Sequence, residues 1–475
     1  MDGREQGTTS AVDRRIALTR RWDELVEEVR RLGRAQNIPQ LADFLRPPTA
    51  ASLTVAAREG AVVVLNLSDG RSDAILLVGD EIRSLPLPLL DPVDVRARTT
   101  SYLNCLTALE KAGWNLQRAM VPFARGDRKR RVFARIARAR LSLSDARDAA
   151  ERELAGLAVW LWDAIARPVL DDLGHRGPAA PGDPLPRLWW CPTGLLALLP
   201  LHAAGHHAEE ETEAYPTVLD RVVSSYTPTV RALIAARDGT PRPHLRGGSD
   251  SADLLFVAPE PEGLPHLPAH EADRDSLRQA FGDRLTSLRG EEATVEAVLE
   301  ALSRHPRAHF SSHAAQRLDR PGEGGIVLRD GLLHVHDLVE ERFTGEFAFL
   351  SACQTAVGGV GLADESITLA AALHFAGFRH VIGTLWSVQD SAASVITRDF
   401  YAAGAREARV AGTGGEEVPG PGFDPADAAR RLHHAVRAMR ERDRVRARQR
   451  QERRGGTRSD HLRLTTWVPF IHIGP

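Results

Sequence analysis

Apolar and polar residues along the chain follow two spacings, which predict two kinds of element. From Asp13 to about Gly33, apolar residues recur every three or four positions, as on one face of an amphipathic helix. Residues 61–89 contain short β-branched and aliphatic runs broken by Asp69-Gly70, which predicts a small β-meander. Residues 92–172 return to the helical spacing. The first half of the chain is therefore predicted to be helical around one small meander.

The second half begins after a Pro- and Gly-rich break, GHRGPAAPGDPLP, at about residue 175. Beyond it, apolar runs typical of buried strands alternate with helical patterns: strands near 253, 309, 347 and 380, and helices at 268–281 and 365–378. This alternation predicts βαβ units, hence an α/β fold with a mostly parallel sheet flanked by helices. We divide the chain into N-terminal helices (1–50), an accessory or regulatory region (51–175) and a catalytic domain (176–475).

Two segments lack apolar periodicity and are rich in small or turn-forming residues. They are residues 244–253 and residues 404–422. We predict that both are surface loops inserted between elements of the second half.

The composition excludes several classes of protein. The 475 residues carry a formal net charge of -2, so no overall positive field favours nucleic acid, and no apolar run reaches the roughly 18 residues of a membrane span. The three cysteines lie far apart without CxxC spacing, which indicates neither a disulfide framework nor a metal site. We expect a soluble protein of the reducing cytoplasm.

Two residues that end predicted strands can do chemistry together. Cys353 follows the apolar run 347–350, and His313 follows the run around 309–312. If these strands are neighbours, both side chains meet at one edge of the sheet, where functional groups of α/β proteins gather. An imidazole beside a thiol stabilises the thiolate, which is the species that attacks a carbonyl.

The same residues also have a purely structural interpretation. A cysteine after an apolar strand is commonly an inert core residue, and a histidine there is commonly a hydrogen-bonded structural group. Periodicity alone does not place the two strands side by side, so spacing leaves both interpretations open.

The segments AHFSSHAA and FAFLSACQTA, which contain His313 and Cys353, resemble the His and Cys blocks of CHAT domains. These domains are relatives of caspases and separases, in which a Cys/His dyad cleaves peptide bonds. Further segments resemble the family in the same order: WWCPTGLLALLPLHAAG, ATVEAVLEAL, ADESITLAAALHFAGFRHVIGTLWSVQD and TTWVPFIHIGP. The resemblance covers about residues 155–475. It implies a caspase-like fold, with Cys353 as nucleophile and His313 as general acid and base.

One position departs from the family pattern. Members usually carry Gly directly after the catalytic His, where its backbone N–H helps hold the oxyanion; here the residue is Ala314. Alanine keeps the N–H but resists positive φ. The predicted oxyanion hole therefore consists of the Ala314 and Cys353 N–H groups, and it is distorted if the backbone at Ala314 requires φ > 0.

Acidic residues near the dyad suggest a substrate preference. Asp364 and Glu365 follow the VGGVGLA loop, and Asp390 follows the run HVIGTLW. Carboxylates in a first pocket would favour a basic residue before the scissile bond, with Ser351 as a further substrate contact. The alternative is that Asp364 and Asp390 each cap the helix that follows.

The resemblance implies a cysteine endopeptidase that acts on protein substrates without a cofactor or metal. In this family such peptidases often serve bacterial defence or cell-death-like responses and are switched on by a partner or sensor protein. A rival interpretation is a caspase-like scaffold that binds partners while its dyad is idle. A second rival, a nucleic-acid-binding regulator, is disfavoured by the near-neutral charge.

Overall fold

A computed structural model describes most of the chain. It covers residues 5–38, 41, 44–124, 126–177, 184–207, 217–238, 254–261, 267, 269–315, 323–340, 343–351, 369–411, 424–454 and 463–475, without the side chains of 5–13, 390, 403–411, 448 and 450–454. These residues form two compact units, 1–53 and 54–475, each of which is described by itself.

The first unit is dominated by one long helix. Helix α1 spans Glu5–Ala35, which confirms the amphipathic helix predicted from residue 13 onward. Its end is tied to the following segment, because the Nε of Arg30 donates a hydrogen bond of 2.7 Å to the carbonyl oxygen of Phe44. Short helix α3 (Ala50–Thr54) follows at the boundary of the second unit.

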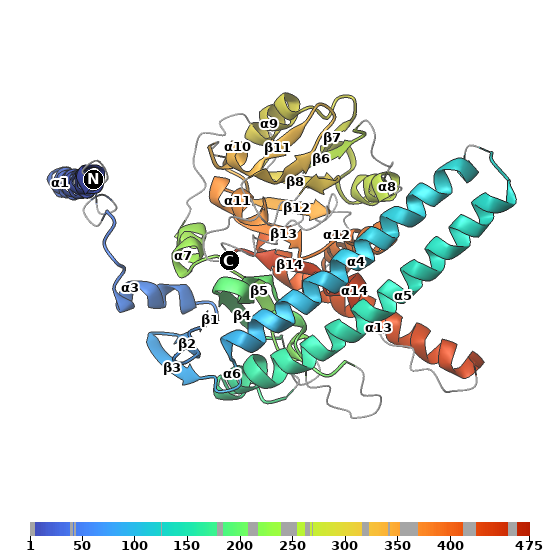
Figure 1. Cartoon of the computed structure of the whole chain (residues 1–475), viewed down its shortest axis with the longest axis horizontal. Helices are drawn as coiled ribbons and strands as arrows, with labels where there is room; N and C mark the ends of the chain where they lie inside the picture. Colours follow the sequence, from blue (N-terminus) through green and yellow to red (C-terminus); the bar gives the residue numbers. More distant parts are fainter. Residues whose placement is uncertain are drawn as a thin grey trace. The chain divides into compact units, whose positions relative to one another are not determined.

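The second unit is built on an 11-stranded sheet of order β3-β2-β1-β4-β5-β14-β13-β12-β8-β6-β7 (Figure 1). Its strands are β1 (Ala61–Asn66), β2 (Asp73–Val78), β3 (Glu81–Pro86), β4 (Arg187–Pro192), β5 (Val223–Tyr226), β6 (Leu254–Pro259), β7 (Leu285–Gly290), β8 (Arg307–Ser311), β12 (Phe347–Ser351), β13 (His380–Thr384) and β14 (Phe470–Ile473). A small antiparallel sheet contains β9 (Ala314–Ala315), β10 (Gly325–Val327) and β11 (Leu332–His334).

Most neighbouring strands of the large sheet run parallel. Seven of its ten pairs are parallel, and β1–β2, β2–β3 and β13–β14 are antiparallel. The antiparallel β13–β14 pair joins two parallel blocks that run in opposite directions. The predicted α/β fold with a mostly parallel sheet is confirmed.

Helices flank this sheet. They include α4 (Pro92–Ala124), α5 (Arg130–Leu161), α6 (Arg167–Asp172), α7 (Val230–Asp238), α8 (Ala269–Phe281), α9 (Val295–Arg304), α10 (Val335–Glu340), α11 (Leu369–Ala376), α12 (Asp390–Ala411), α13 (Ala428–Arg454) and α14 (Leu464–Trp467). The long helices α4 and α5 lie side by side as a hairpin (Figure 1). The predicted helical stretch 92–172 is confirmed.

The predicted loop 404–422 begins later than expected. Helix α12 continues to Ala411, because GAREARVA contains good helix formers such as Ala, Arg and Glu, which the small-residue criterion overlooked. Residues 412–422 and the whole predicted loop 244–253 lie outside the described residues.

The predicted meander is confirmed as β1–β3, and it belongs to the large sheet. Strand β1 pairs parallel with β4, with Ala61 opposite Leu188 and Val64 opposite Cys191. The sheet therefore continues across residue 175, the position at which we divide the chain, and that division stays a prediction.

The core consists of the inner strands and the helices against them. Trp189 and Trp190 on β4 are fully buried, as are Phe310 on β8 and Phe349 on β12. Neighbouring residues of one strand point to opposite faces, so the sheet is covered on both sides, as expected of parallel sheets.

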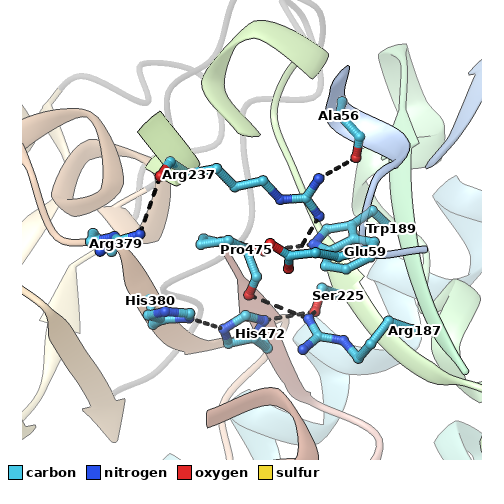
Figure 2. Close-up of polar contacts among 11 residues, drawn as sticks. Ala56, Glu59, Arg187, Trp189, Ser225, Arg237, Arg379, His380, His472 and Pro475 are labelled. Carbon is cyan, nitrogen blue, oxygen red and sulfur yellow. Dashed lines mark hydrogen bonds and ion pairs between the residues drawn. The ribbon is translucent and has the colours of Figure 1, made fainter. Parts of the chain in front are cut away.

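A buried polar network, comprising Arg187, Ser225, His472 and His380, crosses β4, β5, β14 and β13 (Figure 2). Arg187 donates a 2.7 Å hydrogen bond to the Ser225 hydroxyl, whose oxygen lies 2.8 Å from Nδ1 of His472. Nε2 of His472 lies 3.2 Å from Nδ1 of His380. Burial lowers the pKa of His380 to about 3 and that of His472 well below its usual value, so both rings are neutral.

Candidate active site

The two strands that precede the predicted dyad are direct neighbours. Strands β8 and β12 pair parallel, with Ser311 opposite Ser351 at their carboxyl ends, and the Ser312 N–H donates to the Ser351 carbonyl oxygen at 3.4 Å. His313 follows the end of β8 by two residues. Cys353 stands in the same relation to β12, but it lies outside the described residues, as do Asp364 and Glu365. Because Ser311 pairs with Ser351, strands β8 and β12 end at the same level of the sheet.

The two histidines of AHFSSHAA have different environments. His309 lies inside β8, fully buried, with its ring stacked on Phe349 at 4.8 Å and its Nδ1 3.2 Å from the hydroxyl oxygen of Tyr401. Burial lowers the pKa of His309 to about 3. His313 is half-buried at the sheet edge and lines a cavity of about 570 Å³. Only a histidine with such access can exchange protons with a substrate.

The strand ends at this edge are held by a buried carboxylate. The hydroxyl of Ser311 donates a 2.9 Å hydrogen bond to Oδ2 of Asp273 on α8, and both residues are buried. Because a buried carboxylate requires polar partners, this contact fixes the end of β8. His313 thus follows a rigid strand end, which is how a reactive side chain is held in place.

Helix α4 reaches across the sheet edge and contacts His313. The ring of Trp114 stacks on the His313 imidazole, with 6.3 Å between centroids and 29° between planes. Glu110, one turn earlier, accepts a 2.9 Å hydrogen bond from the hydroxyl of Ser387, which follows β13. Both residues line the cavity. The predicted accessory region therefore forms one wall of the cavity beside His313.

The backbone at Ala314 is extended. Ala314 is in β9, opposite Ile326 of β10, and it is not among the residues with positive φ. Alanine adopts this conformation without strain, so the condition that would distort the oxyanion hole is not met. Because the Val327 N–H donates to the His313 carbonyl oxygen, the alternation of an antiparallel ladder directs the Ala314 N–H away from β10.

The two described cysteines have environments that suppress reactivity. Cys191 is buried in β4, and burial raises the pKa of its thiol to about 12. Cys105 on α4 is half-buried, and burial again raises its pKa. A thiol with a raised pKa forms little thiolate at neutral pH.

Of the predicted substrate contacts, the structure describes Ser351 in full and Asp390 by its backbone only. Ser351 ends β12 and lines the cavity. Asp390 is the first residue of α12, but its side chain is not described, so its role as a helix cap or a pocket carboxylate stays a prediction.

Sequence reasoning missed the residues that α4 contributes, above all Trp114 and Glu110. The helical spacing of residues 92–172 showed that one face is buried. It carried no signal about which surface that face covers.

Among the residues that the structure describes, no group of three or more His, Cys, Asp or Glu side chains is arranged to hold a metal ion. Within the same residues, none of the helices combines the length and apolar character needed to cross a membrane.

The sequence matches the CHAT domain family over residues 156–475, which is more than half of the chain. The chain belongs to the CHAT domain family. This confirms the resemblance of residues from about 155 onward, and the match includes His313 and Cys353. No curated protein matches the CHAT protein described here.

Two solved structures are similar to this chain at low sequence identity. Saccharomyces cerevisiae separase, in a separase–securin complex, matches with a TM-score of 0.50 and 11% identity, covering 89% of this chain and 30% of the separase chain. The Arg-specific cysteine proteinase gingipain R matches with a TM-score of 0.36 and 10% identity, covering 66% of this chain and 67% of its own. The match to separase shows a shared fold.

Proposed function

We propose that this CHAT protein is a cysteine endopeptidase, with Cys353 as nucleophile and His313 as general acid and base. The observation that supports this most strongly is the pairing of β8 with β12, which puts Ser311 opposite Ser351 beside the cavity that His313 lines. In the sequence, His313 and Cys353 each stand two positions beyond one of these serines. The two described cysteines, Cys105 and Cys191, have raised pKa values, which leaves Cys353 as the best nucleophile.

In the proposed reaction, the Cys353 thiolate attacks a peptide carbonyl carbon and forms a C–S bond. The N–H groups of Ala314 and Cys353 stabilise the oxyanion. His313 protonates the leaving amine as the C–N bond breaks, and then takes a proton from the water that hydrolyses the acyl-enzyme. In this proposal the carboxylates of Asp364, Glu365 and Asp390 favour a basic residue before the scissile bond.

We further propose that the peptidase is cytoplasmic, acts in bacterial defence or a cell-death-like response, and is controlled by a partner protein. The separase structure contains securin as a partner. A partner that binds the α4–α5 hairpin would act close to His313, because Trp114 of α4 stacks on its ring. The rival scaffold function predicts the same partner binding without thiol chemistry.

Labelling with acyloxymethyl-ketone peptides that carry basic, acidic or apolar first residues tests the dyad. We expect the wild type to be labelled and Cys353→Ala to lose labelling altogether, because the sulfur that the probe alkylates is absent. His313→Ala should lose labelling by about 10²–10⁴-fold, the usual contribution of an acid–base group. Cys105→Ala and His336→Ala are matched controls, since His336 is an exposed histidine. Labelling that survives in Cys353→Ala would reject the dyad. Absence of labelling with every probe and every added partner would favour the scaffold.

A further inference from the structure

The cavity beside His313 has one wall that does not come from the family core. Helix α4 contributes Leu106, Leu109, Gly113, Trp114 and Leu116 to this wall, and α5 contributes Leu143. All of these residues precede residue 156, where the match to the CHAT family begins. The shape and chemistry of this wall are therefore properties of this chain.

The described lining of the cavity is largely apolar. The cavity is also bounded by Leu267, Trp386 and Val388. Its charged side chains among the described residues are Glu110 and Arg147, which have opposite signs. With one charge of each sign, the described lining offers no excess of either charge. Such a surface favours an apolar group, because burying it removes apolar area from water.

Gly113 leaves the space open. It lies in the interior of α4 and lines the cavity, and a Cβ atom placed there would meet no atom of the described residues within 4 Å. Glycine has a low helix propensity, so almost any larger residue at this position would make α4 itself more stable. A side chain at this position would project into the cavity and reduce its volume.

We propose that α4 forms a substrate subsite that takes one large apolar side chain, aromatic or leucine-like, from a residue near the scissile bond. The proposal rests on the peptidase function proposed above. A cavity of about 150 Å³ holds a benzene ring, and this one has about 570 Å³. Trp114 contacts both the cavity and His313, so the occupant lies beside the proposed dyad.

A positional peptide library, scanned independently at each residue around the cleavage site, tests the subsite. We expect one position at which Phe, Leu or Trp gives at least tenfold higher kcat/KM than Ala or Asp, the discrimination typical of an apolar pocket. Gly113→Leu should remove most of this preference by filling the cavity, while the better helix former preserves the fold. Asn115→Leu is the matched control, because Asn115 is exposed on the same helix and does not line the cavity.

The outcome separates failure of the subsite from failure of the peptidase. If the wild type cleaves peptides and the Gly113→Leu protein shows the same preference, the subsite is wrong and the peptidase function stands. If no peptide is cleaved, the subsite is tested by calorimetry, which measures the binding of library peptides to the Cys353→Ala protein. Binding of a Phe peptide at least tenfold tighter than its Ala analogue, lost in the Cys353→Ala/Gly113→Leu double variant, supports the subsite without catalysis. Equal binding of the two peptides overturns it.

Discussion

The cavity at His313 and the buried network of Arg187, Ser225, His472 and His380 are two histidine-containing regions of one sheet. In the network, His472 is 1% exposed and its ring nitrogens contact Ser225 and His380. His313 is half-buried, faces a large cavity and stacks on a tryptophan from another part of the chain. A histidine that a substrate can reach from a cavity is therefore a candidate for catalysis. A histidine that is closed off from substrate is a structural group.

Arginines reinforce the structural character of the network (Figure 2). The Arg187 and Arg237 guanidinium groups lie 4.5 and 4.4 Å from the ring centroid of the fully buried Trp189. Burial lowers the pKa of Arg187 to about 10, with further lowering by Arg430. Such cation–π contacts are strongest where water is excluded, so they stabilise this part of the sheet.

The largest expected effect is the loss of stability on acidification, which the buried histidines cause. Burial lowers the pKa of His202 and His207 to about 4, and that of His309, His380 and His433 to about 3. In the unfolded chain these rings bind protons near pH 6.5, so between about 6.5 and 3–4 protonation favours unfolding. Each contributes up to about 1.4 kcal/mol per pH unit to the loss of stability.

One buried carboxylate acts in the opposite direction. Burial raises the pKa of Glu151 to about 7, although hydrogen bonds from Thr465 oppose the shift. The contribution of Glu151 to the free energy of unfolding falls as pH rises from about 4.5 to 7. The change per pH unit is as large as that from one histidine. Between pH 7.5 and 4.5, the free energy of unfolding measured with denaturant should therefore fall by more than about 1.4 kcal/mol per pH unit. A flat profile would contradict the neutral, buried state of these histidines.

The next largest effect should come from His472→Ala. This change removes a buried ring, leaves a cavity and deprives the Ser225 hydroxyl and Nδ1 of His380 of a partner. We expect a loss of about 3 kcal/mol in the free energy of unfolding. Thiol labelling per folded molecule should stay at the wild-type level, whereas His313→Ala should show the reverse pattern. Loss of labelling in folded His472→Ala protein would erase the distinction between the two regions.

The smallest effect should come from Ala314→Gly, which restores the residue that the family usually carries. Because Ala314 is extended in β9, glycine relieves no strain. We expect kcat/KM within about threefold of the wild type and a destabilisation of about 0.5–1 kcal/mol from the added chain entropy. An increase of tenfold or more in kcat/KM would mean that alanine does restrict the oxyanion hole.

Several features of the molecule were predictable from local pattern. The spacing of apolar residues predicted α1, the meander β1–β3 and the strands β6, β8, β12 and β13, because periods of 3.6 and 2 reflect local backbone geometry. The order of short motifs predicted the CHAT family. The boundary of α12 was missed, since propensity in GAREARVA outweighed the small-residue pattern.

Tertiary structure alone decided which of these elements meet. The sequence by itself determined that His313 and Cys353 each follow a strand, but only the pairing of β8 with β12 made those strands neighbours. An amphipathic pattern likewise says that a helix buries one face, not which surface it covers, so Trp114 had no visible link to His313 until α4 was seen across the sheet edge. Contacts between residues distant in sequence depend on how whole surfaces fit together, and that information is spread over the entire chain.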